Sequence, residues 1–214
     1  MLDTAIQTLG EQGHDVKVSD LYEMQFNPMP GRHDFDSALS EDWFNYQDEQ
    51  KHAHSQGAFK ADIKAEHEKL EWADLVILQF PLWWFSMPAI LKGWVDRVFA
   101  YGYAYGGGRW YDQGVFSGKR AMLGITVGGP STAYTADGLQ GEMSNILFPV
   151  EHGIQQFVGF SVLPAFVAYS ANYCDAELRE SVLQDFRERL KKIESAEPIG
   201  MPAVAEYDEG LQKS

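Results

Sequence analysis

The chain has 214 residues and is acidic, with 31 Asp and Glu residues against 17 Lys and Arg residues and a formal net charge of −14. This charge argues against nucleic acids and anionic membrane surfaces as partners, while an apolar content of 45% is enough for one domain with a substantial core. The single cysteine, Cys174, excludes a disulfide framework and fits a reducing, cytoplasmic location.

The N-terminal part of the chain carries short and separate patterns. Residues 6–9 have the spacing of a helix that stops at Gly10 or Gly13. Residues 14–19 alternate with period two, which predicts a strand. Residues 26–59 are polar and rich in turn formers, so we expect a long irregular segment there. The acidic start has no basic stretch followed by apolar residues, and no signal peptide is expected.

The remainder alternates between strand and helix patterns. The elements expected here are strands at 74–80, 120–126 and 162–169, and helices at 63–70, 88–99, 146–157 and from Asp175 onward. The two best strands are continuously apolar, which is typical of a parallel sheet covered on both faces. The most apolar window, 75–91, is interrupted and too short to cross a bilayer, so no membrane insertion is expected. We predict an α/β domain over 1–198 and an extended tail over 199–214.

Three strand ends carry the residues of chemical interest: 81–85, 128–134 and 169–173. In a doubly wound sheet these would meet at one edge, where ligands bind. Aromatic rings in 81–85 could cover a flat ligand, and Gly128-Gly129 would let it approach the backbone, although ordinary core aromatics and a plain turn explain the same residues.

Other candidates are less specific. The Tyr134 hydroxyl could bond a developing anion, or Tyr134 could be an ordinary half-exposed tyrosine. The Gly- and Tyr-rich loop 101–108 could cover a site for planar substrates or simply lie at the surface. The six histidines lack the spacing of metal ligands, so no metal site is predicted.

Taken together, the motifs resemble the flavodoxin-like NAD(P)H:quinone oxidoreductases, the family of mammalian DT-diaphorase. The resemblance covers residues 5 to about 198 and is carried by Ser19-Asp20-Leu21-Tyr22, Phe26-Asn27-Pro28, Ala73-Asp74-Leu75-Val76, Phe80-Pro81-Leu82, Pro88-Ala89-Ile90-Leu91-Lys92-Gly93-Trp94, Arg97-Val98-Phe99, Tyr111-Asp112, Gly128-Gly129, Gly138, Gly141, Gly159-Phe160 and Arg187-Glu188-Arg189-Leu190. It implies a flavodoxin-like doubly wound sheet, a homodimer, and FAD-dependent two-electron reduction of quinones by NAD(P)H in a ping-pong scheme.

The resemblance also assigns site residues. The positions that would contact the flavin are Pro81, Leu82, Trp83, Trp84, Phe85, Thr126, Gly128, Gly129, Tyr134 and Arg179, the last near the adenylate part. Tyr105 and Phe157 match aromatics that line the quinone and nicotinamide pocket, partly from the opposite subunit.

The chain departs from the family pattern in two side chains. Gln140 stands where the mammalian enzyme has a histidine thought to share the flavin's negative charge, and glutamine cannot become a cation. Gln140 is nevertheless expected beside Tyr134 as a catalytic residue. Tyr173 replaces a second active-site histidine, and we expect it to influence substrate choice.

The start of the sequence departs as well. Family members begin earlier, with a first strand and a loop that binds the FAD pyrophosphate. In a sheet of order 2-1-3-4-5 that strand lies between the second and the third. Without it, residues 16–18 and 75–78 are expected to lack ladder partners.

Three functions therefore remain open from the sequence. The first is the FAD-dependent quinone reductase. The second is a flavodoxin-like electron carrier that binds FMN, which the Gly- and Tyr-rich loop argues against because a carrier needs an exposed flavin edge. The third is a cofactor-free fragment that acts only as a dimerising domain.

Overall fold

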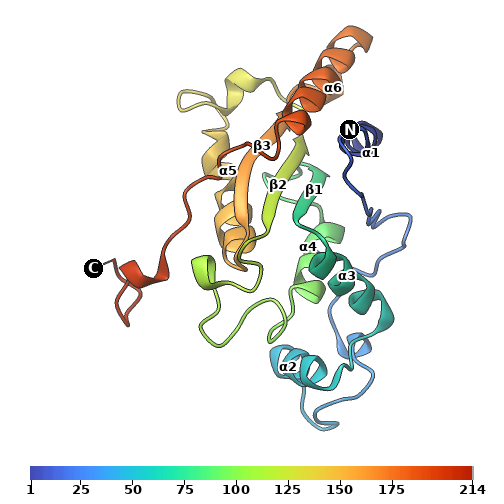
Figure 1. The fold of residues 1–214 in the computed structure, drawn as a ribbon, viewed down its shortest axis with the longest axis vertical. Helices are drawn as coiled ribbons and strands as arrows, with labels where there is room; N and C mark the ends of the chain where they lie inside the picture. Colours follow the sequence, from blue (N-terminus) through green and yellow to red (C-terminus); the bar gives the residue numbers. More distant parts are fainter. Residues whose placement is uncertain (214) are drawn as a thin grey trace.

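A computed structural model describes residues 1–213 as a parallel sheet with helices on both faces (Figure 1). The strands are β1 (Leu75–Pro81), β2 (Arg120–Thr126) and β3 (Ser161–Ala168), paired in the order β1-β2-β3. The α-helices are α1 (Leu2–Glu11), α2 (Tyr46–Gln56), α3 (Ala61–Trp72), α4 (Ala89–Val98), α5 (Met143–Val150) and α6 (Ala176–Lys191). The predicted doubly wound α/β architecture is confirmed.

The continuously apolar strands form the centre of two cores. On one face of the sheet, α1 and α6 pack on side chains that include Met122 and Leu163. On the other face, α3, α4 and α5 cover a larger cluster that includes Leu123 and Ile125. Because β2 has a neighbour on each edge and helices above and below, its central side chains are fully buried.

Helix boundaries follow local sequence rules. The Asp175 carboxylate accepts a hydrogen bond from the Leu178 N–H at 2.8 Å, so α6 begins where the cap was predicted. Gly13 has φ of 88°, and the chain turns there after α1. The predicted helix over 146–157 is observed as α5 followed by a π-helical turn at Glu151–Gln156.

Two sequence predictions are wrong. Residues 14–19 form no strand, because no neighbouring backbone in the described chain pairs with them. Residues 26–59 are not irregular throughout, since they contain α2. The Asn45 side chain accepts from the Asp48 N–H, and Gly57 ends this helix with φ of 64°. The helix is polar on most of its surface, which explains why its periodicity was not visible.

A buried ion pair attaches the segment 26–59 to α4. The Arg97 guanidinium lies 2.8 Å from Asp34 Oδ1 and 2.8 Å from Asp62 Oδ2, and it donates to the Asn27 carbonyl oxygen. The Tyr46 hydroxyl donates to Asp34 Oδ2 at 2.6 Å. Asp34 and Arg97 are almost fully buried, so removing either would leave an uncompensated charge.

The tail leaves the domain along β3 and the loop before β2. The Ile199 N–H donates to the Val162 carbonyl at 2.8 Å, and the Val204 N–H donates to Asp112 Oδ1 at 2.9 Å. Figure 1 shows the last residues extending away from the sheet. Among the described residues, none of the helices has the length and hydropathy required of a transmembrane segment.

Candidate functional site

The loops that follow the three strands are joined by backbone hydrogen bonds at the carboxyl edge of the sheet. The Leu82 N–H donates to the Thr126 carbonyl at 2.9 Å. The Ser170 and Ala171 N–H groups donate to the carbonyls of Gly129 and Val127, both at 2.9 Å. The three predicted loop tips therefore lie along one edge of the sheet, as the strand order requires.

The turn after β1 has an unusual backbone. Trp83 and Ser86 exchange two hydrogen bonds of 3.0 and 2.9 Å, and the two residues between them have positive φ, 51° for Trp84 and 58° for Phe85. Turns of this kind favour Asn and Gly, and bulky residues in the left-handed region cost about 1–3 kcal/mol each. Strain of this size is typical of positions that hold a ligand.

The same turn leaves polar groups free. Within residues 1–213, the N–H groups of Trp84 and Phe85 have no hydrogen-bond partner. The Trp84 side chain is 95% exposed, and Phe85 is also exposed. Two adjacent donors beside two uncovered aromatic rings can bond the edge of a flat heterocycle and cover part of its face.

The loop after β2 brings Tyr134 against Gly129. A Cβ atom on Gly129 would lie 3.2 Å from Cε2 of Tyr134, and a Cβ atom on Gly128 would lie 2.8 Å from Nδ2 of Asn172. A side chain at residue 128 would require Asn172 to shift, and one at residue 129 would press on the Tyr134 ring; without side chains, the backbone here is open to close approach. The ring of Tyr169 lies 5.8 Å from that of Tyr134, and burial, with a smaller effect of Tyr134, raises the pKa of the Tyr169 phenol.

Thr126 and Arg179 share a small cavity at this edge. The cavity has a volume of about 230 Å³ and is also lined by Ala168, Tyr169 and Cys174. Arg179 itself is exposed on the first turns of α6. The guanidinium is therefore a cation at the same edge as Thr126, on the side nearer β3.

A separate aromatic group forms around Phe157. Its ring lies 5.7 Å from Tyr105, 6.2 Å from Trp110 and 5.8 Å from Tyr111. Gln47 donates to the Tyr105 hydroxyl at 2.9 Å, which connects α2 to this group. The sequence reasoning named Tyr105 and Phe157 but missed Trp110 and Tyr111, although both continue the same Tyr- and Gly-rich loop.

The side chains of Gln140 and Tyr173 are not held against the other candidate residues. Gln140 is exposed, and its N–H donates to the Ala133 carbonyl at 2.9 Å, which closes the loop that carries Tyr134. Tyr173 is 81% exposed on the loop after β3. Among the described residues, neither side chain has a hydrogen bond that fixes it toward the other candidates.

Comparison with known proteins places this architecture in a family. A family model described as "Flavodoxin-like fold" matches residues 1–193. The chain is 39% identical over 213 residues to NAD(P)H dehydrogenase [quinone] 1 of Rattus norvegicus, covering 99% of this chain and 78% of that protein. The chain belongs to the flavodoxin-like NAD(P)H:quinone oxidoreductase family.

Two further members of this oxidoreductase family support the assignment. The chain is 43% identical to ribosyldihydronicotinamide dehydrogenase [quinone] of Mus musculus, over 91% of this chain and 85% of that protein. A solved structure from Klebsiella pneumoniae, assigned as a quinone reductase, superposes with a TM-score of 0.95 at 41% identity and covers 99% of this chain and 86% of that one. The resemblance read from the sequence motifs is thereby confirmed.

Proposed function

We propose that this protein is a flavin-dependent NAD(P)H dehydrogenase that reduces quinones by two electrons. The observation that carries the proposal is the pair of left-handed aromatic residues, Trp84 and Phe85, whose free N–H groups lie at the same sheet edge as Gly129 and Tyr134. The relatives named as quinone dehydrogenases, at about 40% identity over most of the chain, support the same activity.

The residues at the edge fit a flavin ring. The two glycines leave a stretch of backbone without side chains, the turn has free N–H donors, and the Tyr134 hydroxyl adds a donor next to Gly129. When bound, FAD supplies hydride chemistry between a nicotinamide and a quinone. Tyr134 and the free N–H groups of the turn would orient the ring and would place hydrogen-bond donors where they can stabilise negative charge.

FAD rather than FMN is proposed because of Arg179. Arg179 lines a cavity next to Thr126, and its guanidinium could pair with the second phosphate, that of the adenylate part, which FMN lacks. We also propose that the Gln140 side-chain amide donates a hydrogen bond near Tyr134, although glutamine cannot take up a proton and become a cation.

The aromatic group around Phe157 supports a planar substrate. Tyr105 and Phe157 offer flat faces, and Tyr173 lies on the loop after β3, where it could contact the same substrate. We propose that NAD(P)H and the quinone occupy this place in turn, which is the physical basis of a ping-pong scheme.

We also propose a homodimer located in the cytoplasm. Trp84, Phe148 and Leu139, the last at 94% exposure, are exposed apolar side chains of the kind that a second copy could cover. The aromatic side chains that line the proposed substrate-binding site would then come from two subunits.

The test is to purify the protein with its cofactor and identify the released flavin by mass. Bound FAD, quinone-dependent oxidation of NAD(P)H and parallel double-reciprocal lines would support the proposal. FMN with no turnover would favour the electron carrier, and a colourless protein that takes up no flavin would favour a cofactor-free domain.

A further inference from the structure

Helix α2 presents two glutamines to the loop that carries Tyr105. Gln47 and Gln50 are three residues apart and therefore lie on one face of the helix. The Gln50 amide is almost fully buried, donates to the Asp96 carbonyl at 3.2 Å and accepts from the Tyr101 N–H at 3.0 Å. The Gln47 amide donates to the Tyr105 hydroxyl at 2.9 Å. The helix therefore holds this loop at two points.

The backbone between these two points is fixed as well. The Gly102 N–H donates to the Tyr105 carbonyl at 2.8 Å, and the rings of Tyr101 and Tyr105 lie 5.4 Å apart. Gly102 has φ of 91°, and a Cβ atom there would lie 3.4 Å from Cα of Lys51, so the loop lies directly against α2. The Tyr105 ring therefore has a defined place relative to Gln47.

The bond from Gln47 has a direction that matters for Tyr105. An amide nitrogen only donates, so the phenol oxygen is the acceptor and its own proton is not used. Within residues 1–213, the Tyr105 hydroxyl has no second hydrogen-bond partner. An O–H group whose oxygen accepts a hydrogen bond is also a stronger donor, because neighbouring hydrogen bonds polarise one another. Tyr105 therefore carries a free and strengthened donor.

This donor belongs to the aromatic group around Phe157, whose ring lies 5.7 Å from that of Tyr105. The other hydroxyl in the group, on Tyr111, already pairs with Nε2 of His152 at 3.2 Å. Tyr105 is therefore the hydroxyl of this group that a ligand can engage. A planar ligand with an acceptor oxygen at the edge of its ring can stack on the aromatic side chains and accept this hydrogen bond.

We propose that Gln47 is a positioning residue that keeps the Tyr105 hydroxyl directed as a donor to a ring carbonyl of the quinone. This inference rests on the proposed function. It narrows the substrate class to planar molecules with a carbonyl oxygen at the ring edge, because a flat hydrocarbon has no acceptor for this donor. Losing one neutral hydrogen bond of this kind weakens binding by up to about tenfold.

The test measures the dissociation constant of 2,3-dimethyl-1,4-naphthoquinone by equilibrium dialysis against the purified protein with its flavin oxidised and no reductant present. The methyl groups occupy the ring carbons that would otherwise react with the free thiol of Cys174. The matched control ligand is 2,3-dimethylnaphthalene, which has the same carbon skeleton and no carbonyl. Binding is thereby measured without turnover.

Two variants of Gln47 separate the direction of the bond from packing. Gln47→Glu keeps the shape of the side chain and suits the first turn of a helix, but its ionised carboxylate only accepts, so it captures the Tyr105 proton. Gln47→Leu frees the hydroxyl without capturing its proton. We expect the dissociation constant of the quinone to rise about tenfold in the glutamate variant and about threefold in the leucine variant. A role in packing alone predicts the opposite order.

Further variants serve as checks. Tyr105→Phe should weaken quinone binding about as much as Gln47→Glu, and adding either change at residue 47 to it should have no further effect. Gln184→Leu, which removes an exposed bond of 3.1 Å to Glu188 on α6, should leave binding unchanged. The dissociation constant of the hydrocarbon should be nearly the same in all variants.

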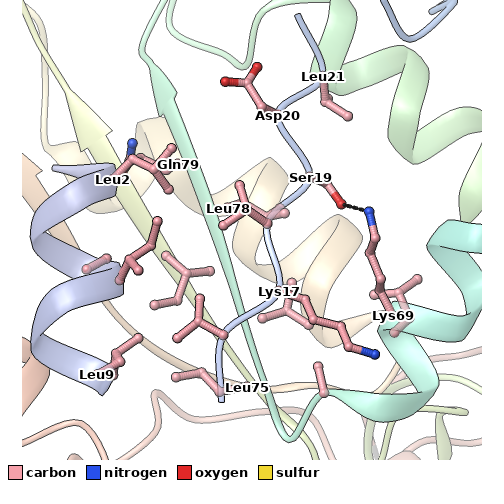
Figure 2. Close-up of a pocket in the computed structure, with 18 of the residues that line it drawn as sticks. Leu2, Leu9, Lys17, Ser19, Asp20, Leu21, Lys69, Leu75, Leu78 and Gln79 are labelled. Atoms are coloured by element: carbon pink, nitrogen blue, oxygen red, sulfur yellow. Dashed lines mark hydrogen bonds between the residues drawn. The ribbon is translucent and has the colours of Figure 1, made fainter. Parts of the chain in front are cut away.

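A larger cavity elsewhere in the molecule could also take up a flat apolar probe. It has a volume of about 920 Å³ and lies along β1, between α1 and the segment through Lys17 and Ser19 (Figure 2). Its lining includes Ile6 but neither Gln47 nor Tyr105. Ile6→Asp places a charge in this cavity and should leave quinone binding unchanged.

Four results would overturn the inference. They are unchanged quinone binding in both variants of Gln47, a larger loss in the leucine than in the glutamate variant, an equal loss for the hydrocarbon, and a loss in Ile6→Asp as large as in Gln47→Glu.

The same proteins are then assayed for oxidation of NAD(P)H by the quinone. We expect the variants of Gln47 to raise the KM for the quinone with little change in kcat, because the bond acts on binding. Absence of turnover in the unchanged protein would contradict the proposed function, whereas the dissociation constants test Gln47 with or without turnover. The two failures are therefore distinguishable.

Discussion

The ring of Tyr134 lies against the backbone of Gly129, closely enough that a Cβ atom on the glycine would come within 3.3 Å of the tyrosine hydroxyl oxygen. The two residues belong to one loop, and the Gly129 carbonyl is held by the Ser170 N–H. The position of this hydroxyl therefore depends on the absence of a side chain at residue 129.

Replacing Gly129 with alanine should displace Tyr134 and narrow the backbone surface. We expect flavin affinity to fall by about tenfold, the effect of roughly one lost hydrogen bond. A fluorescence titration of the apoprotein measures it. Gly153→Ala is the matched control, since nothing lies within 4 Å of its would-be Cβ, and equal losses in both variants would contradict the assignment.

Replacing Tyr134 with phenylalanine removes a hydroxyl that has no hydrogen bond to another described residue. Stability should change little, whereas the rate of flavin reduction by NAD(P)H should fall by about ten- to a hundredfold, as expected for one lost donor to developing charge. Stopped-flow absorbance measures this rate. An unchanged rate would remove Tyr134 from the mechanism, and Tyr22→Phe, at an exposed site, is the control.

Arg97→Met should destabilise the fold strongly. It leaves the Asp34 carboxylate buried without its partner, a change that typically costs about 3–5 kcal/mol. Lys92→Met on the same helix breaks only the exposed pair with Asp96 and should cost at most about 1 kcal/mol. Urea unfolding measures both variants, and similar losses would mean that Arg97 does not act through its charge.

Stability should fall at acidic pH through His67. Burial lowers the pKa of this imidazole to about 4, and its Nε2 lies 2.8 Å from the Val98 carbonyl oxygen. The folded state disfavours protonation, so its stability is fully present above the unfolded pKa of about 6.5 and is lost as the pH falls toward 4, by roughly 3 kcal/mol.

His67→Gln keeps a donor for Val98 and removes this titration. The pH dependence of the unfolding free energy should therefore be flatter in the variant between pH 6.5 and 4. Burial raises the pKa of Glu151 to about 6. The effect of Glu151 on the unfolding free energy has the opposite sign, because its contribution is lost as the pH rises from 4.5 through 6. Glu151 is present in both proteins, so subtracting the two curves isolates His67, and identical curves would refute its role.

The sequence predicted the parts of the fold that depend on continuous apolar runs. β2 was placed at Arg120–Thr126, as observed, because a strand buried on both faces has a composition that few other elements share. The strand predicted over 14–19 is not observed, because a strand needs a neighbouring strand to pair with, and alternation within one segment does not reveal whether such a neighbour exists. Helix α2 was not predicted because its residues are mostly polar and show no apolar stripe; only its cap, Asn45, and its final glycine, Gly57, mark where it begins and ends.

The sequence was sufficient to name the loops that carry the candidate site, but not to predict the backbone conformation of those loops. Strand ends could be read from the sequence, so the loops at one edge were identified. The left-handed turn at Trp84 and Phe85 could not be foreseen, since these residue types disfavour that conformation and only the surrounding structure imposes it.

The most direct measurement is a titration of the apoprotein with FAD followed by amide chemical shifts at single residues. The account predicts saturable shifts at Trp84, Phe85 and Gly129, with the amides of residues 14–19 and of Gly153 unchanged. Binding that shifts other amides and leaves these three unaffected would contradict the claim that this sheet edge holds the flavin.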